Sequence, residues 1–219
     1  MAKRRRVGNL LALAVLSTVA YRPMHPYEMG QALRGWGKDD DMPIKWGSLY
    51  TVVRNLDKHG LLAAAESSRQ GARPERTVYR ITDEGRAELL DWARELVSTP
   101  ETEPSRFKAG LSVLVVLPPD EAAELLRGRI DLLDAEVSGR RAALAGHAGT
   151  VPPLFLVEDE FELAMREAEA SWVRGLLDQI DSGRYPGMAE WRAWHETGRV
   201  SAEVAALAEG TFTTAEPTD

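Results

Sequence analysis

Residues 46–85, WGSLYTVVRNLDKHGLLAAAESSRQGARPERTVYRITDEG, contain the change of pattern from which the fold class follows. The first part of this stretch, residues 46–59, repeats apolar side chains at helical spacing and is followed by Gly60, a suitable helix stop. The spacing then changes. Residues 61–66 and 76–81 are short β-prone runs, separated by a polar loop that contains glycine and proline. This stretch therefore predicts a helix followed by a two-stranded hairpin.

Helical patterns flank this stretch on both sides. Upstream, residues 7–20 form a leucine-rich helix that should be largely buried, and a second helix begins at Pro26 and stops at Gly35. The polar, acidic residues 38–43 should form a loop. Downstream, Thr82 is a suitable N-cap for a helix that reaches residue 96. Three helices, a hairpin and a further helix are the order of a winged helix-turn-helix domain.

The second half of the chain is predicted to be helical. Residues 106–117 are one apolar segment, Asp120 should cap a long helix that restarts after Pro118, and another long helix covers residues 158–182. The first long helix carries an apolar seam suited to a partner helix. The expected fold class is mainly α with a small β-hairpin wing. It should comprise a winged helix-turn-helix domain (1–98), a helical dimerisation domain (105–183) and a mobile C-terminal tail (184–219).

The net charge of −7 is distributed unevenly along the 219 residues. Residues 1–100 contain 16 Lys and Arg against 12 Asp and Glu, whereas residues 101–219 contain 11 against 22. This asymmetry suggests that only the first half meets a polyanion such as double-stranded DNA. The absence of cysteine excludes disulfides and cysteine-based zinc sites.

The N-terminus combines a basic run, residues 3–6, with an apolar run, residues 10–20, as a secretory signal peptide does. Residues 21–25 (YRPMH) do not resemble a cleavage site, and the apolar run is too short to span a membrane. We therefore expect a cytoplasmic protein without a membrane segment.

The helix at residues 46–59 carries, opposite its apolar stripe, side chains of the types that contact DNA. Arg54 can bind guanine O6 and N7, and Asn55 can bind adenine N6 and N7. The other predicted DNA contacts come from the same helix face and from the hairpin loop: Ser48, Tyr50, Thr51, Lys58, Arg73 and Arg76. Any solvated helix shows a polar face, but the basic loop and residues 3–6 favour DNA. A winged helix that binds another protein, which would need no basic wing, is the alternative.

Signatures of catalysis are absent from the sequence. The four histidines have no metal-ligand spacing, and His25 stands where it can cap or pack against a helix. The chain has neither a Gly-rich phosphate loop after a strand, nor a Gly-x-Ser-x-Gly motif, nor a cysteine nucleophile. We therefore expect no enzyme, no metal site and no cofactor.

Four short motifs occur in order along the first half: residues 24–28 (MHPYE), 47–50 (GSLY), 56–61 (LDKHGL) and 79–85 (YRITDEG). Together they resemble the PadR family of bacterial regulators, with Pro26 in place of the family's usual glycine. The resemblance covers residues 8–95. Residues 107–183 are similar in layout to the C-terminal helical domain of the longer PadR subgroup.

The resemblance implies a homodimer that binds an inverted repeat, usually represses a nearby promoter and places Tyr50 at the DNA surface. The first helix and the long C-terminal helices would form the dimer interface, with these candidate residues: Leu10, Leu13, Ile130, Leu133, Val137, Phe161, Trp172 and Leu176. Some family members bind small aromatic or lipophilic compounds. Trp92 and Trp172 are therefore candidates for an effector site, although ordinary core packing is the simpler interpretation of both.

Overall fold

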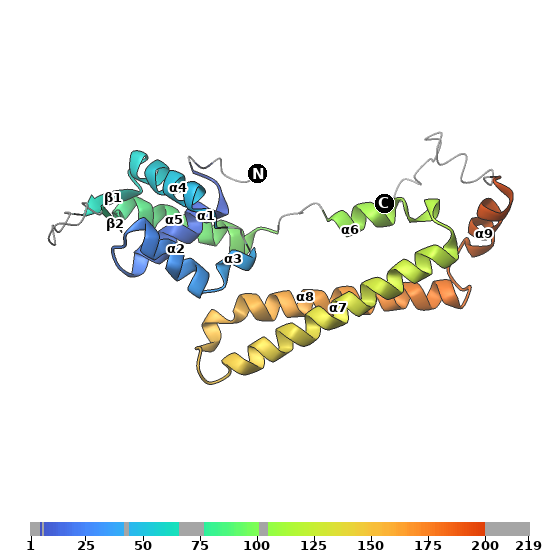
Figure 1. The fold of residues 1–219 in the computed structure, drawn as a ribbon. Coiled ribbons are helices and arrows are strands. Elements are labelled where there is room, and N and C mark those ends of the chain that lie inside the picture. Colours follow the sequence, from blue (N-terminus) through green and yellow to red (C-terminus); the bar gives the residue numbers. More distant parts are fainter. Residues whose placement is uncertain (1–4, 6, 42–43, 66–76, 101–104, 200–219) are drawn as a thin grey trace, which may run out of the picture. The chain divides into compact units, whose positions relative to one another are not determined.

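The computed structural model describes residues 5, 7–41, 44–65, 77–100 and 105–199, and the chain divides into two compact units, residues 1–103 and 104–219. Unit 1 contains the following elements (Figure 1): α1 (Leu10–Tyr21), α2 (Pro26–Gly35), α3 (Lys38–Asp41), α4 (Trp46–Lys58), β1 (Leu62–Ala65), β2 (Val78–Ile81) and α5 (Asp83–Ser98). This order confirms the predicted winged helix-turn-helix. Its core is built from fully buried residues of α1, α2 and α4, among them Leu16, Met29 and Leu49.

The hairpin of unit 1 is a small antiparallel sheet in which Leu62 lies opposite Ile81 and Ala65 lies opposite Val78. Met24, just before α2, adds an isolated bridge to Tyr79, with N–O distances of 3.0 and 2.9 Å. The connection between α1 and α2 is thereby tied to the wing by two backbone hydrogen bonds.

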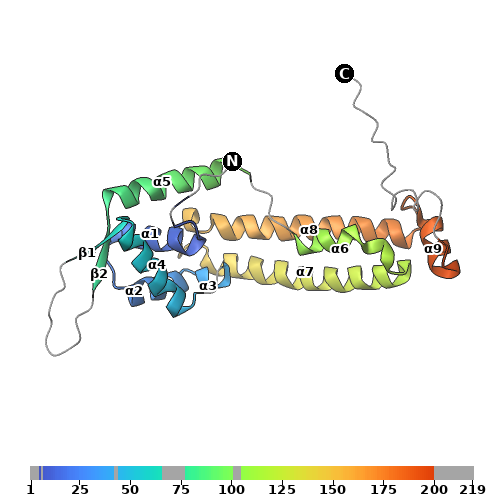
Figure 2. The ribbon, with the colours of Figure 1, turned by 90° about the horizontal axis from the view of Figure 1, so that it is seen from above.

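Unit 2 contains α6 (Arg106–Ser112), the 3-10 turn η1 (Leu114–Val116), α7 (Pro119–His147), the 3-10 turn η2 (Pro153–Phe155), α8 (Val157–Asp181) and α9 (Met188–Thr197). Figure 2 shows α7 and α8 side by side along most of their length. Their shared core contains Leu126, Leu133, Val173 and Ile180. The apolar seam predicted on α7 therefore has a partner helix within the same chain.

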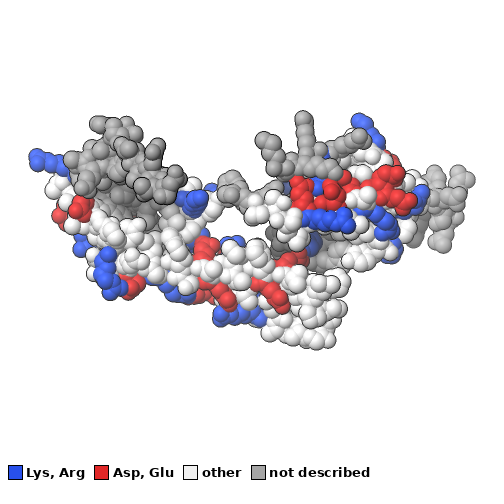
Figure 3. All heavy atoms as spheres, turned by 180° about the vertical axis from the view of Figure 1, so that it is seen from behind, with Lys and Arg blue, Asp and Glu red and all other residues white. Residues whose placement is uncertain are grey.

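Ion pairs cross between α7 and α8 on the flanks of this core. They include Arg127 with Asp181 (2.6 Å), Arg141 with Glu167 (2.6 Å), Arg129 with Glu169 and Arg174 with Asp134. Along the long helices Figure 3 accordingly shows basic and acidic side chains interspersed rather than gathered in patches of one sign. Most of these groups remain partly solvated, so each pair contributes little to stability. Together the pairs favour one register of α7 against α8.

Three boundary predictions in unit 1 and α7 are corrected by the structure. Residues 38–41 form the helical turn α3 rather than a loop. The first helix begins at Leu10, not at residue 7, because the side chain of Asn9 accepts a hydrogen bond from the Ala12 N–H at 2.8 Å. Asp120 is not the N-cap of α7. Pro118 holds that position and Asp120 lies in the first turn, where the helix dipole favours a carboxylate.

Two further corrections concern the ends of unit 2. Residues 106–117 are not one segment, because α6 ends at Ser112 and η1 follows. The expectation of a mobile tail from residue 184 is wrong for residues 188–197, which form α9. Buried Trp191 anchors this helix, and its indole N–H donates to the carbonyl oxygens of Val115 (3.1 Å) and Leu117 (2.8 Å). Residues 200–219 lie outside the described residues.

Candidate nucleic-acid interface

Helix α4 separates its side chains into two faces. Leu49, Val52, Val53 and Leu56 are buried in the core of unit 1. The predicted DNA-contacting residues of this helix are all exposed: Ser48, Tyr50, Thr51, Arg54, Asn55 and Lys58. The arrangement follows from the helical period, since residues three and four apart share a face. One polar surface therefore gathers all six residues.

The close approach of α2 fixes the position of α4. A Cβ atom on Gly30 would lie 2.6 Å from the indole of Trp46, so only glycine fits there without displacement. The Trp46 ring is stacked on Tyr27 at 5.1 Å between centroids, and the Arg34 guanidinium lies 4.5 Å from the Trp46 centroid. These contacts hold the first turn of α4 against α2.

Two contacts restrict side chains on the polar face of α4. Thr51 donates its hydroxyl hydrogen to the carbonyl oxygen of Gly47 at 2.8 Å and accepts a long hydrogen bond, 3.4 Å, from Nη2 of Arg54. Tyr50 packs edge-on against His25, with 6.4 Å between ring centroids. His25 also accepts a hydrogen bond from the Tyr27 N–H at its ring Nδ1, 3.1 Å away, which confirms its predicted capping role.

Sequence reasoning did not single out two exposed cations of unit 1, Lys45 just before α4 and Arg80 on β2. Lys45 occupies the N-cap position of α4, whose first turn has no acidic residue. The positive charge of Lys45 adds to the partial positive charge at the N-terminal end of α4. This end of the helix is therefore suited to bind a phosphate. The position of Lys45 directly before the helix could have indicated this role from the sequence. Arg80 lies on β2, where the alternation of a strand turns it outward.

The wing arginines predicted to contact DNA, Arg73 and Arg76, lie outside the described residues. The base of the wing is described and is locked to α5. Thr82 donates its hydroxyl hydrogen to the carbonyl oxygen of Gly60 at 2.7 Å and accepts the Gly85 N–H at 2.9 Å, as a predicted N-cap should. A Cβ on Gly85 would lie 2.0 Å from the carbonyl oxygen of Leu61, so the motif at residues 79–85 requires glycine at its end.

The basic N-terminal run is only partly described, and its described member does not face DNA. Arg5 is buried against α5, with 4% of its side chain exposed, and pairs with Glu88, Glu95 and, at 3.3 Å, Asp91. Burial opposes its charge, but hydrogen bonds and attraction from Glu88 and Glu95 outweigh burial and raise the pKa of Arg5. The grouping of Arg5 with DNA-facing residues is therefore wrong.

Tyr79 on β2 lies in the electrostatic field of α4. Burial and the negative charge of Asp57 raise the pKa of its phenol, while Arg54 acts in the opposite direction. The phenol of Tyr79 thus stays neutral at physiological pH. It links the wing electrostatically to the polar face of α4.

The candidate effector residues lie in different units. Trp92 is buried in the core of unit 1, with the Arg5 guanidinium 5.0 Å from its ring centroid, so the structure gives it the core-packing role. Trp172 lies on α8 and is 52% exposed.

The candidate dimer residues divide by exposure. Leu133, Val137 and Leu176 are buried within unit 2, and Leu13 and Ile130 are partly buried against the cores of their own units, so packing inside the chain occupies these side chains. Leu10, Phe161 and Trp172 are exposed. Leu133 and Leu176 lie in the core that α7 and α8 share within the chain.

No group of three or more His, Cys, Asp or Glu side chains among the described residues could hold a metal ion. No helix in the described ranges is both long and apolar enough to cross a bilayer.

Comparisons with known proteins agree with this architecture. Residues 15–91 match the sequence model of the "Transcriptional regulator PadR-like family". The negative transcriptional regulator PadR of Bacillus subtilis (strain 168) is 23% identical over 145 residues, which are 63% of this chain and 79% of that protein.

Solved structures of Bacillus subtilis PadR have the same fold. The structure in complex with operator DNA has a TM-score of 0.63 at 21% identity and covers 78% of this chain and 99% of its own. The structure in complex with p-coumaric acid has a TM-score of 0.66 at 18% identity, with coverages of 79% and 99%. The four motifs of the winged helix thus lie within a region, residues 15–91, that is similar to the PadR-like family of transcriptional regulators.

Proposed function

We propose that this protein is a bacterial, cytoplasmic repressor that binds an inverted-repeat operator as a homodimer and is released by a small aromatic or lipophilic ligand. The observation that carries DNA binding is the exposed face of α4, from Ser48 to Lys58, directed away from a fully packed core. Arg54 and Asn55 would read bases, and their neighbours on this face and the wing arginines Arg73 and Arg76 would hold phosphates.

Homodimerisation is supported by an apolar stripe on α8. Phe161, Met165 and Trp172 are all exposed and recur at helical spacing along one side of the helix. Three more exposed apolar side chains lie near the start of α8: Leu154 and Phe155 of η2, and Val157. A monomer rarely leaves a continuous stripe of this kind in water. A second copy packed on Phe161 and Met165 would bury this part of the stripe, leave Trp172 beyond its edge, and bring two α4 helices to the two halves of a palindromic site.

Repression and release by a ligand are supported by the relative. The curated Bacillus subtilis protein is a negative regulator, and one of its solved structures holds p-coumaric acid. In this chain Trp172 is the exposed indole available to such a compound, whereas Trp92 is covered by Arg5.

The experiment is a titration of fluorescent DNA from upstream of this protein's own gene, against a scrambled duplex, at several salt concentrations. Strong preference for the native fragment with a steep salt dependence would establish a sequence-specific regulator, and footprinting would then show whether the site is an inverted repeat. Weak and equal binding to both duplexes at low salt would contradict self-regulation. Capture of a protein partner by unit 1 would then become the leading test.

A further inference from the structure

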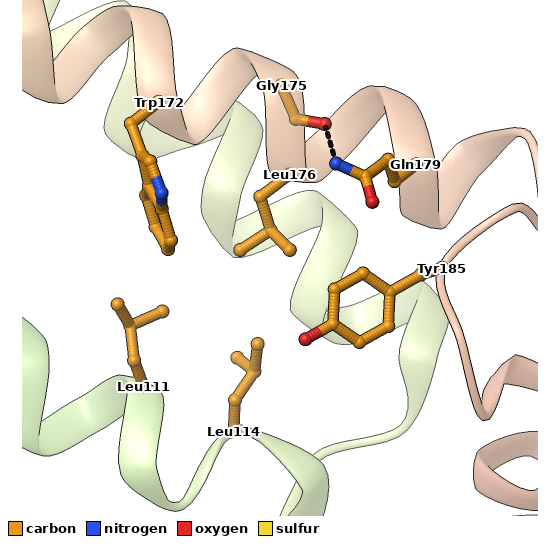
Figure 4. Close-up of a pocket in the computed structure, with 7 residues that line it drawn as sticks. All are labelled: Leu111, Leu114, Trp172, Gly175, Leu176, Gln179 and Tyr185. Carbon is orange, nitrogen blue, oxygen red and sulfur yellow. Dashed lines mark hydrogen bonds between the residues drawn. The ribbon is translucent and has the colours of Figure 1, made fainter. Parts of the chain in front are cut away.

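Unit 2 contains a hollow of about 510 Å³ that is open to solvent and lies between α6, η1, α8 and the turn before α9 (Figure 4). Volumes of roughly 300–1,000 Å³ are typical of sites for small molecules. Leu111, Leu114 and Leu176 form apolar walls, and the Trp172 ring lies beside them. The remaining lining residues are Gly175, Gln179 and Tyr185.

Contacts outside the hollow hold its walls in place. Trp172 packs edge-on against Phe107 of α6, 6.1 Å between centroids, and Phe107 is covered on its face by Arg129 of α7 at 3.7 Å. The two hydrogen bonds from Trp191 to backbone carbonyls fix η1, which carries Leu114. The Tyr185 N–H donates to the carbonyl oxygen of Gln179 at 3.0 Å. The hollow is therefore preformed, which lowers the entropic cost of filling it.

The polar groups in the hollow are few and uncharged. In Figure 4 the Tyr185 hydroxyl points into the space beside Leu114, and no described residue bonds to it. The Gln179 side-chain N–H donates to the Gly175 carbonyl at 3.3 Å, which leaves the amide oxygen as an acceptor. None of the described lining residues carries a charge. Much of both ring surfaces is uncovered, since Trp172 is 52% and Tyr185 is 41% exposed.

We propose that this hollow binds an uncharged small molecule that has a ring system and a hydroxyl group. The rings would stack on Trp172 and displace water from the three leucines, and the hydroxyl would bond to Tyr185 and to the Gln179 oxygen. A carboxylate would leave water without a cation to pair with, which is costly. This inference rests on the proposed regulation by a small ligand and gives that ligand a site and a chemical class.

The test compares two probes of the same shape, 2-naphthol and 2-naphthoate, by calorimetry on the full chain. We expect 2-naphthol to bind about tenfold more tightly, because the anion would give up part of its hydration without gaining a cation among the described lining residues. Tyr185→Phe should weaken 2-naphthol by about fivefold through loss of one hydrogen bond. Equal affinities for the two probes would overturn the uncharged class, and no heat from either at millimolar concentration would overturn the site.

A second variant separates loss of the site from loss of the fold. A Cβ on Gly175 meets nothing within 4 Å, so Gly175→Leu should fold, gain helix propensity and fill the hollow. It should abolish 2-naphthol binding, whereas Gly139→Leu, an equally open glycine on α7 outside the hollow, should not. Unchanged binding by Gly175→Leu would overturn the site. If the wild type binds no probe and Gly175→Leu alters the sedimenting mass, the occupant is a second copy, and the inference fails.

These outcomes are independent of DNA binding. Failure of the probes with intact operator preference would leave the proposed regulator standing without this site, whereas lost operator preference with intact probe binding would contradict the regulator alone.

Discussion

The two units bury their apolar side chains in different ways. Unit 1 closes a core of its own, in which side chains from α1, α2, α4 and the hairpin are almost fully buried. Unit 2 buries one face of α7 and α8 against each other and leaves apolar side chains of α8 and η2 exposed. Unit 1 leaves the polar face of α4 exposed together with scattered apolar side chains such as Leu10 and Val97, whereas in unit 2 exposed apolar side chains recur along one side of α8. A row of exposed apolar side chains, unlike scattered ones, is typical of a surface that another molecule covers.

The strongest disruption of unit 1 should come from Gly85→Ala. The new Cβ would meet the Leu61 carbonyl oxygen at 2.0 Å, and backbone atoms cannot move aside as a flexible side chain can. We expect a loss of at least about 3 kcal/mol in the free energy of unfolding of unit 1, measured by urea denaturation. Gly47→Ala, where a Cβ meets nothing within 4 Å, is the control and should be neutral or stabilising. Equal stability of both variants would show that the hairpin is not locked to α5.

Charged side chains on the apolar stripe of α8 should weaken the proposed association of two copies. The double variant Phe161→Asp, Met165→Asp should raise the dimer dissociation constant at least about a hundredfold, because two charges would be buried in the proposed interface. Sedimentation velocity measures the change. Leu132→Asp, an exposed leucine on α7 outside the stripe, is the control and should leave the mass unchanged. A double variant that keeps the wild-type mass would remove α8 from the interface.

The recognition face of unit 1 is tested by Arg54→Ala. Loss of a bidentate contact to guanine should cost about 1–3 kcal/mol in operator affinity and relax the base preference at one position. Arg94→Ala, which removes an exposed arginine from α5 instead, should change neither quantity. A uniform loss over all sequences would instead identify Arg54 as a phosphate contact.

The smallest effect is expected from the phenol of Tyr79. Its pKa is raised in the folded protein, so the stability it contributes is present below the ordinary tyrosine pKa and is lost as pH rises through the folded pKa. The free energy of unfolding should therefore fall above about pH 10. Tyr79→Phe should reduce the alkaline slope relative to the wild type. An unchanged slope would place the phenol in an environment like water.

Much of unit 1 was predictable because its signals are local. The four apolar positions of α4, the Thr82 cap and the break at Gly60 each act within a few residues of chain, and all are found where predicted. The role of Arg5 was not predictable, because its three carboxylate partners lie more than 80 residues away on α5. The sequence of a basic run does not show whether its side chains will contact DNA or the carboxylates of a helix in the same chain.

Unit 2 shows the same limit more strongly. The sequence indicated two long helices with apolar seams, but a seam does not state which helix will cover it. For Leu133 and Leu176 the partner is within the chain, while Phe161 and Trp172 stay exposed. The sequence around Trp191 did not indicate that its indole would donate to the carbonyls of Val115 and Leu117, which lie 76 and 74 residues earlier in the chain.

Periodicity, caps and turn glycines are local properties of a chain, so the amino-acid sequence alone predicted the winged helix, the polar face of α4 and the resemblance to PadR regulators. The folded chain was needed to show which apolar faces remain uncovered, which cations are neutralised and where a preformed hollow lies. Those properties depend on distances between residues far apart in sequence, and such distances are set by packing rather than by any local pattern.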